Sequence, residues 1–268
     1  MNTKEKLLWA AIAVVLAGVG YAGYLYLKDA KEETGPTEQT QAPPPEPPKE
    51  AGIENPVPGG EGQGAAGKPL PALGASDGEF ADALAQLAGQ DSLAALLVRE
   101  SIIRNIVVTV DNLPRAKVAV ERRPVKPTPG ETRIEGDADA GEVTTLSVQN
   151  YARYSPFVKA VGATDTKEVV ALYFHWYPLF QKAYEDLGYP DRYFNDRLVA
   201  AMDDLLKAPE VEGPVRLVRP RVFFEFADPT LEQRSAGQKL LIRMGLENEV
   251  KVKAKLRELR AAIAARKP

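Results

Sequence analysis

The 268-residue chain contains no cysteine and only one histidine, His175. Without cysteine it cannot form disulfides, thiolate zinc sites or a thiol nucleophile. A single histidine excludes HExxH and other multi-histidine metal sites within one chain, and no G-x-S-x-G motif marks a serine hydrolase. We therefore predict no metal site and no cofactor, and the sequence favours a binding module over an enzyme.

The chain also lacks an excess of basic residues. Its net charge of −3 arises within the first 75 residues, which carry six Lys and nine Asp or Glu. From Ser76 onward, 28 basic side chains balance 28 acidic ones. A domain that binds nucleic acid usually presents a basic face, so nucleic acid is not an expected partner.

One long stretch without charge is present, at residues 7–27. As a helix it would be about 31 Å long, which matches the roughly 30 Å hydrocarbon core of a bilayer. Trp9 and three tyrosines near the other end are placed as interfacial aromatic residues would be. The run is too long for a signal peptide and has no small-x-small cleavage site at its end. We predict that residues 1–28 form a tail and a retained transmembrane anchor that contacts the lipid bilayer.

The flanking charges do not decide the orientation of this anchor, because Lys4 and Lys6 precede it and Lys28 and Lys31 follow it. The segment before the anchor is only six residues long. Such a short segment usually stays in the cytosol, so we expect the C-terminal domain to lie outside the cytoplasm.

Residues 29–75 are rich in proline and glycine and nearly free of aromatic and branched side chains. PPPEPP occupies positions 43–48 and a glycine-rich stretch follows at 57–64. Such a segment buries too little apolar surface to offset its conformational entropy. We predict a disordered linker, either a spacer that positions the domain or a passive connection.

Residues 76–268 are predicted to form a mainly helical globular domain with a small β-hairpin and short strands. Ser76 and Glu79 have the spacing of a capping box at a helix start. Pro178 is expected to kink or split its helix, and Gly245 suits a break between the last two. The apolar periodicity places helices at 93–97, 99–112, 150–161, 166–187, 193–206, 229–244 and 247–265, the hairpin within 123–148, and strands at 215–218 and 222–226.

Six segments of this domain resemble those of an uncharacterised protein family: VDNLPR (110–115), NYARYSPFV (150–158), GYPDRYFNDRLV (188–199), PEVEGPVRL (209–217), FEFADP (224–229) and SAGQKLLIRMG (235–245). Members of that family are Gram-negative bacterial proteins with one N-terminal membrane helix, a proline-rich linker and a C-terminal domain of unknown function. The resemblance covers about residues 73–260. It implies a single-pass protein of the inner membrane with a periplasmic domain, and it carries over no catalytic or ligand residue.

Polar residues within these segments are our candidates for a shared binding surface. Side chains of this kind equally well serve as buried hydrogen-bonding groups that fix loops. The candidates are Asn112, Arg115, Asn150, Arg153, Tyr154, Asn195 and Arg197.

Three other features have two interpretations each. His175 lies among aromatic residues that favour a helix packed in a core, although a platform for a sugar ring has the same spacing. Glu225 and Asp228 are candidate carboxylates for glycoside cleavage, but Asp228 before Pro229 suits a helix N-cap. The basic residues of the final helix either bind anionic envelope polymer or lipid headgroups, or form a solvated face.

The sequence thus predicts a membrane-tethered binding or scaffolding module of the bacterial cell envelope. Its partner would be an anionic envelope polymer or another envelope protein. Two alternatives are an envelope hydrolase that acts on cell-wall glycan, with Glu225 or Asp228 as the acid, and an accessory subunit of an inner-membrane complex.

Overall fold

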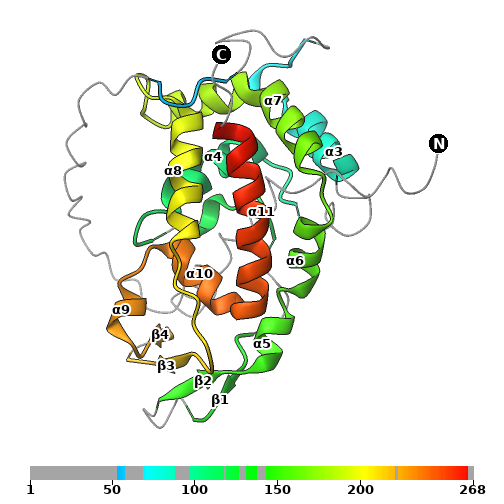
Figure 1. Ribbon diagram of the computed structural model, residues 1–268. Helices are drawn as coiled ribbons and strands as arrows, with labels where there is room; N and C mark the ends of the chain where they lie inside the picture. The colour runs from blue at the N-terminus through cyan, green and yellow to red at the C-terminus, as the bar shows by residue number, and fades with distance from the viewer. Residues whose placement is uncertain are drawn as a thin grey trace, which may run out of the picture.

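The computed structural model describes residues 53–57, 69–87, 97–117, 119–126, 131–137, 143–220 and 223–264. This part of the chain contains nine α-helices and four short strands, and is therefore mainly helical with a minor β element, as predicted (Figure 1). None of the described helices has the length and apolar character needed to cross a membrane. The predicted anchor, residues 7–27, lies outside the described residues.

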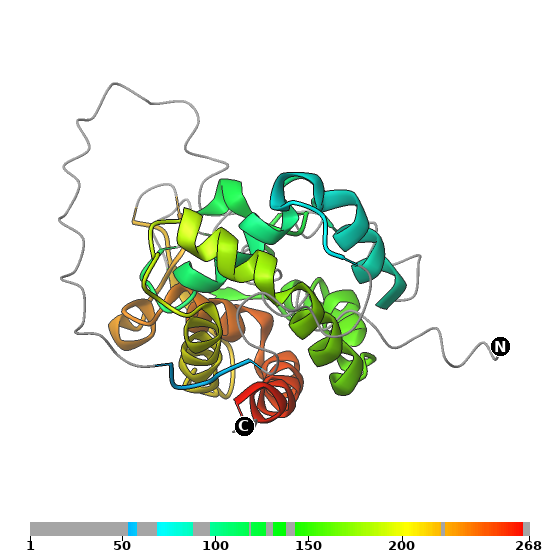
Figure 2. The same cartoon turned by 90° about the horizontal axis from the view of Figure 1, so that it is seen from above.

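The larger helices surround one apolar core. Helices α8 (Phe194–Leu206) and α11 (Leu246–Ala264) run side by side, which Figure 1 shows from the side and Figure 2 nearly end-on. Helix α11 also contacts α6, α7 and α10, and α4 contacts α3, α7 and α8. The bounds of these other helices are α3 (Asp77–Leu87), α4 (Ile102–Asn112), α6 (Ser155–Gly162), α7 (Thr166–Asp186) and α10 (Ala236–Met244).

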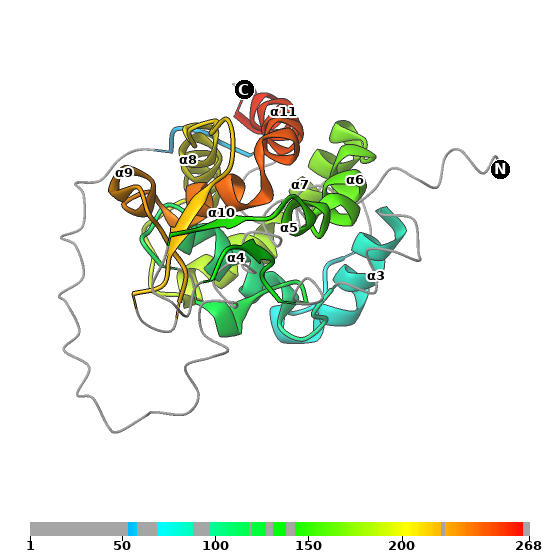
Figure 3. The same ribbon diagram turned by 90° about the horizontal axis from the view of Figure 1, so that it is seen from below.

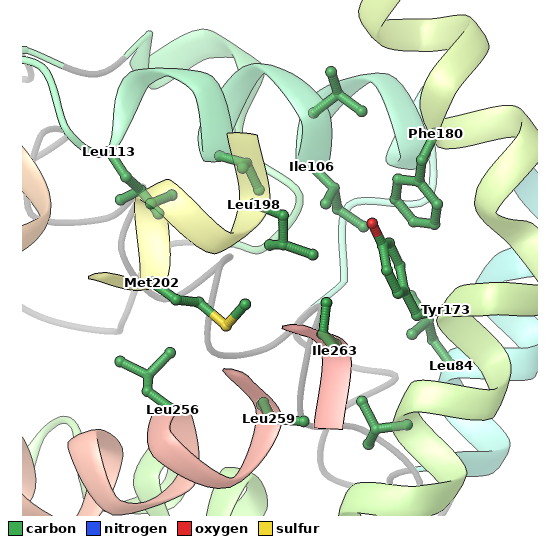
Figure 4. Packing of buried hydrophobic residues seen from close by; sticks show 14 of the residues in the cluster. Leu84, Ile106, Leu113, Tyr173, Phe180, Leu198, Met202, Leu256, Leu259 and Ile263 are labelled. Carbon is green, nitrogen blue, oxygen red and sulfur yellow. The ribbon is translucent and has the colours of Figure 1, made fainter. Parts of the chain in front are cut away.

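Residues from all of these helices meet in the core (Figure 4). Ile106 of α4, Leu198 of α8 and Leu259 of α11 converge there and are at most 2% exposed. Helix α11 faces the core with a stripe of apolar side chains at steps of four, three and four residues. The apolar periodicity from which this helix was predicted is therefore confirmed. The members of the stripe, each 1% exposed, are Val252, Leu256, Leu259 and Ile263.

The aromatic residues of α7 also lie inside the protein. Phe80 of α3 packs edge-on against Trp176 and Phe180, with ring centroids 5.1 and 5.5 Å apart. Phe180 in turn stacks on Phe194 of α8 at 5.7 Å. The interpretation of this spacing as a buried core face is confirmed, and Pro178 does not split α7.

Four strands form an antiparallel sheet in the order β1–β2–β3–β4, which Figure 3 shows from below. Strands β1 (Ile134–Glu135) and β2 (Thr144–Leu146) are the predicted hairpin. Strand β2 pairs with β3 (Arg216–Val218), and β3 pairs with β4 (Glu225–Phe226). Ile242 of α10 covers the sheet and closes a second, smaller core with Leu146, Val215, Leu217 and Phe226.

Two predicted helices are each divided in the structure. The predicted helix 150–161 becomes α5 (Val148–Ala152) and α6, and Pro156 occupies the first turn of α6, where proline favours a new start. The predicted helix 229–244 becomes α9 (Pro229–Glu232) and α10. Ser235 caps α10, because its hydroxyl accepts a hydrogen bond from the Gln238 N–H.

The region before α4 also differs from the prediction. Of the predicted helix 93–97, only Leu97 lies within the described residues, and it forms an antiparallel bridge with Val125. Ser101 adopts a left-handed conformation with φ of 50° ahead of α4. The carboxylate of Asp77 accepts hydrogen bonds from the N–H groups of Ser101 and Ile102 at 2.7 and 3.1 Å, and so caps α4 from a neighbouring helix.

Part of the predicted linker lies on the domain. Leu73 begins a 3-10 helix, η3 (Leu73–Ala75), and packs with Leu70 against the main core. A second such turn, η5 (Val120–Arg122), follows α4. Residues 53–57 are also seated on the domain, with Val57 buried in the main core. The prediction of a disordered linker over 29–75 is therefore wrong for 53–57 and 69–75, because buried branched side chains and specific hydrogen bonds offset the entropy of ordering.

Candidate functional site

Residues 53–57 lie in a strip that bends at Glu54 and Asn55 and crosses the N-terminal end of α8, close to the C-terminal end of α11 (Figures 1 and 2). The carboxylate of Asp196 accepts hydrogen bonds from the backbone N–H of Glu54 at 3.2 Å and of Asn55 at 2.7 Å. It also accepts one from the Asn55 side-chain amide at 2.9 Å. The domain thus recognises both the backbone and one side chain of this strip.

Two further side chains complete the contacts. The side-chain amide of Asn195 donates to the Asn55 carbonyl at 2.9 Å. The phenol oxygen of Tyr193 accepts from the Val57 N–H at 2.9 Å. Three side chains at the start of α8, from residues 193, 195 and 196, therefore hold the strip. We call these three side chains the α8 clasp.

The fold of α8 places these side chains. Tyr193 is the N-cap of the helix, and Asn195 and Asp196 lie in its first turn. A carboxylate in the first turn is stabilised by the helix dipole. Asn195 is fully buried, and its side-chain oxygen accepts a hydrogen bond from the Tyr173 hydroxyl at 2.9 Å, which fixes the amide nitrogen toward Asn55.

Buried polar groups of α7 form hydrogen bonds that hold the start of α8, and with it the clasp, in place. Burial raises the pKa of the Tyr173 phenol well above its usual value, and Tyr193 and Asp196 add to this increase. The phenol therefore keeps its proton and remains a donor to Asn195 across the physiological range. Gln181 accepts hydrogen bonds from the Tyr177 hydroxyl at 3.0 Å and from the Phe194 N–H at 2.8 Å, and so joins α7 to the start of α8.

The side chains of the strip differ in exposure. Val57 is 6% exposed and belongs to the main core, whereas Ile53 is 54% exposed. Asn55 and Pro56 are half-buried. The contacts therefore combine a polar clamp with one apolar side chain that is buried in the core. This arrangement suits the binding of a short peptide segment.

A buried carboxylate of α4 contacts Arg197, the residue that follows Asp196 in α8. Asp111 of α4, whose side chain is 6% exposed, accepts from Nε of Arg197 at 3.0 Å and from Nη2 of Arg115 at 2.6 Å. Arg197 also donates to the Asp111 carbonyl. The hydroxyl of Tyr189 accepts from Arg115 at 2.7 Å. Two guanidinium groups thus compensate one buried carboxylate and join α4 to α8.

The seven candidate residues from the sequence fall into separate places. Asn195 is in the clasp, and Arg115 and Arg197 are on Asp111. Asn112 donates to the Val108 carbonyl within its own helix. Asn150, Arg153 and Tyr154 lie around the α5–α6 junction, at the opposite end of the domain in Figure 1.

This last group holds loops together. Asn150 is buried, and its side-chain oxygen accepts from the Arg133 N–H at 3.3 Å and from Arg153 Nη1 at 2.9 Å. Tyr154 is 3% exposed and part of the main core. The seven residues therefore do not form one surface, and most of them fix loops or helix ends, which is the second of the two roles we considered.

Among the candidate catalytic groups, Asp228 is the N-cap of α9 and accepts from the N–H and the hydroxyl of Thr230, both at 2.8 Å. These hydrogen bonds lower its pKa. A general acid needs the opposite shift, because it must hold a proton near neutral pH. His175 packs edge-on against Trp176 with ring centroids 5.8 Å apart. Within the described residues, no three His, Asp or Glu side chains gather as metal ligands would.

The basic residues of the final helix are largely engaged in ion pairs. Lys253, only 2% exposed, contacts Glu249 at 2.8 Å, and Lys255 contacts Glu258 at 2.6 Å. Arg260 pairs with Asp203. These three charges are therefore not available to an anionic polymer, and the interpretation of α11 as a basic binding face is not supported by them. Arg266 and Lys267 lie outside the described residues.

The sequence does not predict the partners of Asp196 and Tyr193. Asp196 is a first-turn residue of α8, but its carboxylate binds a strip that lies 141 residues earlier. A local signal for that contact is Asn55-Pro56-Val57, the one place in the linker where a turn-forming polar residue, a proline and a branched residue follow one another.

Fold and site together define a mainly helical domain that has a small antiparallel sheet and that holds a short strip of its own chain at the start of α8. The chain belongs to the family described as protein of unknown function (DUF3014), which matches at residues 102–260. The matched range contains Tyr193, Asn195 and Asp196, whereas the strip 53–57 and α3 precede it. No curated protein and no solved structure matches the sequence.

Proposed function

We propose that the protein is a membrane-tethered binding or scaffolding module of the bacterial cell envelope. The observation that carries the proposal is the α8 clasp, because a domain that holds a short strip through its backbone N–H groups, one carbonyl and one side chain has the chemistry of a peptide-binding module. The domain would bind a segment of another envelope protein while the chain keeps it at the membrane.

The tether is supported by the sequence. Residues 7–27 have the length and composition of a membrane span. The resemblance to single-pass Gram-negative proteins supports the same placement. In this proposal the anchor lies in the inner membrane and the domain in the periplasm.

The position of the clasp fits such a tether. Ile53 is the residue of the strip nearest in sequence to the proposed anchor, and the strip crosses the end of the domain formed by α8 and α11 (Figure 1). That end would face the membrane. The sheet and the α5–α6 junction would then point away from it.

The alternative of a cell-wall hydrolase has less support. Asp228 is committed to a helix cap, and its lowered pKa keeps it ionised rather than protonated. A soluble assay with the purified chain and cell-wall glycan tests this alternative, with Glu225→Gln as the comparison. Glycan turnover that Glu225→Gln abolishes would replace the binding proposal by the enzymatic one.

Three measurements on the full-length chain in cells test the proposal. An enzymatic reporter fused after Pro268 is expected to be active only outside the cytoplasm. The intact chain is expected to stay with membranes after a high-salt wash. Crosslinking followed by mass spectrometry is expected to recover an envelope protein joined to the α8 end. A cytosolic reporter signal or release by salt would refute the tether, and crosslinks only to subunits of one membrane complex would favour the accessory-subunit alternative.

A further inference from the structure

We propose that the α8 clasp is a peptide-binding site for short segments of the form Asn-Pro-Val, and that residues 53–57 are its tethered ligand. The inference rests on the proposed function, because it names the ligand of the binding module. It commits to one occupant chemistry, a peptide with the sequence features of 53–57 that bends before its proline, bound in cis by this chain and exchangeable with the same segment offered in trans.

The contacts indicate which features of the peptide are selected. The Asn55 side chain donates to Asp196 at 2.9 Å while its own carbonyl accepts from Asn195 at 2.9 Å. A residue without a side-chain amide would forgo the first of these hydrogen bonds. Asparagine is therefore favoured at this position of the ligand.

The next two positions are selected by shape. Pro56 has no N–H to satisfy, and its ring restricts the conformations that are open to Asn55 in a free peptide. Val57 places a branched side chain in the core while its N–H donates to Tyr193. Ile53 and Glu54 are exposed, and of the two only the Glu54 backbone contacts the clasp. The ligand is thus defined by three consecutive residues.

The connection to the domain makes the strip a ligand in cis. Eleven residues, 58–68, separate the strip from the next described residue, and five of them are glycine. A short glycine-rich connection of this length gives an effective local concentration on the order of millimolar. A free peptide must therefore compete with the tethered copy, and it binds measurably only when the tethered copy is weakened.

Exchange would also change the length of the tether. With the strip in place, residues 28–52 span the distance from the proposed anchor to the domain, about 80 Å when extended. Displacement of the strip by a partner segment would extend this span to residue 68, about 130 Å. Binding of a partner would thus allow the domain to move further from the membrane.

The test uses the full-length chain in detergent and a synthetic peptide of residues 52–59 with an N-terminal fluorophore, followed by fluorescence anisotropy. The variant Asn55→Ala with Val57→Ala weakens the tethered strip. It is expected to bind the peptide at least about tenfold more tightly than the unaltered chain. The reason is that its tethered strip has lost one charge-assisted hydrogen bond and one buried side chain, and therefore competes less well with the peptide.

Two further comparisons decide whether the clasp is the binding site. Asp196→Asn added to that variant is expected to abolish binding, whereas Asp191→Asn, an exposed position in the same motif, is expected to leave it unchanged. Tyr193→Phe removes only the hydroxyl that accepts from Val57 and serves as a second variant if circular dichroism shows that Asp196→Asn does not fold. A peptide with alanine in place of the asparagine is expected to bind at least about tenfold more weakly.

The proposal is overturned if the weakened chain binds the peptide no better than the unaltered chain, if Asp196→Asn or Tyr193→Phe leaves the affinity for the peptide unchanged, or if the alanine peptide binds equally well. None of these outcomes involves a membrane. Failure of the peptide site is therefore distinguishable from failure of the membrane tether, which the reporter and the salt wash test separately.

Discussion

Asp196 accepts hydrogen bonds from both the backbone N–H and the side-chain amide of Asn55, at 2.7 and 2.9 Å, although Asn55 lies 141 residues earlier in the chain. A hydrogen bond to a charged acceptor contributes about 1.5–3 kcal/mol, roughly twice a neutral one. The two bonds therefore give a short strip with one buried side chain a defined place on the domain. They also connect a segment that the composition marks as linker to the motif GYPDRYFNDRLV.

The first prediction concerns release of this strip. Asp196→Asn replaces a charged acceptor by a neutral amide, so the strip should open more often and the amide protons of Asn55 and Val57 should exchange about ten- to a hundredfold faster. Hydrogen exchange followed by mass spectrometry measures this. Val57 is informative because its N–H is bonded to Tyr193 and not to Asp196, so faster exchange there reports release of the whole strip.

Asp191→Asn is the matched control, since it removes the same charge from an exposed position nearby. Exchange at Asn55 and Val57 should be unchanged in that variant. Equal acceleration by both substitutions would mean that general charge, rather than the contact with Asp196, holds the strip.

The second prediction concerns the buried carboxylate of Asp111. Arg197→Gln should destabilise the protein by about 2–4 kcal/mol, because the loss of this partner leaves the Asp111 carboxylate as a desolvated charge. The expected cost is slightly below that for a fully buried ion pair, because the Arg197 side chain is 24% exposed. Arg115→Gln should cost only about 1 kcal/mol, because its side chain is 47% exposed and water screens the interaction. Urea denaturation provides both free energies of unfolding.

Arg104→Gln provides the reference for a surface pair, since Arg104 and Asp186 are 39% and 37% exposed. Its expected cost is below about 1 kcal/mol. A cost for Arg197→Gln no greater than for Arg104→Gln would show that Asp111 is compensated by other means.

Local patterns predicted much of the fold. The apolar stripe of α11, the aromatic face of α7 and the hairpin β1–β2 each depend on residues close in sequence, and each is confirmed. Pairing of Thr145 with Arg216 was not predicted, because strands two or three residues long show no pattern that identifies a distant partner. The division of 150–161 was not predicted, because the apolar periodicity favours one continuous helix despite Pro156.

The candidate site was predicted less well. The motif segments correctly drew attention to Asn195 and Arg197, but not to their separate roles, because the residues that they contact are Asn55 and Asp111 and neither is adjacent in sequence. Lys253 illustrates the same limit. Its charge suggests a solvated position, yet it is 2% exposed, and only tertiary contacts reveal the carboxylate that compensates it.

The third prediction concerns Gly245, which separates α10 from α11. Its φ is +82°, and a β-carbon at this position would lie 2.7 Å from Cγ of Tyr151. Gly245→Ala therefore combines backbone strain with a steric overlap against a ring, and should lower the free energy of unfolding by about 2–4 kcal/mol. Thermal unfolding followed by circular dichroism measures the change.

Gly78→Ala is the matched control. Gly78 lies in α3 with a negative φ, and nothing lies within 4 Å of the position that a β-carbon would occupy. This substitution should be neutral or should stabilise the protein by up to about 1 kcal/mol, because alanine favours helix. A loss of stability in Gly78→Ala as large as in Gly245→Ala would show that overlap with the Tyr151 ring does not explain the effect of Gly245→Ala.

The fourth prediction concerns the ion pair between α11 and the loop after α8. The Lys253 ammonium donates to the Ala208 carbonyl at 2.6 Å and to the Glu210 carboxylate at 3.1 Å, and it lies 2.8 Å from the Glu249 carboxylate as an ion pair. Lys253→Met leaves Glu249, 1% exposed, as a buried carboxylate without its counter-ion. We expect a loss of about 3 kcal/mol in stability at pH 8.

The size of this loss should depend on pH. Burial raises the pKa of Glu249 above its ordinary value of 4.5, so the folded state binds more protons than the unfolded state above pH 4.5, and stability falls as pH rises through the folded-state pKa. Without Lys253 the ionised carboxylate loses its attraction, and its folded-state pKa rises further. The cost of Lys253→Met should therefore be clearly smaller at pH 5, where Glu249 protonates on folding, than at pH 8.

Two comparisons isolate this effect. Lys253→Met combined with Glu249→Gln has no buried charge at the site, so its stability relative to the unaltered chain should be nearly the same at pH 5 and pH 8. Lys251→Met on the same helix removes an exposed partner of Glu247 and should cost under about 1 kcal/mol at either pH. Equal losses at the two pH values for Lys253→Met alone would show that Glu249 is not the group that titrates. The double variant is the reference for this conclusion, because it differs from Lys253→Met only at Glu249.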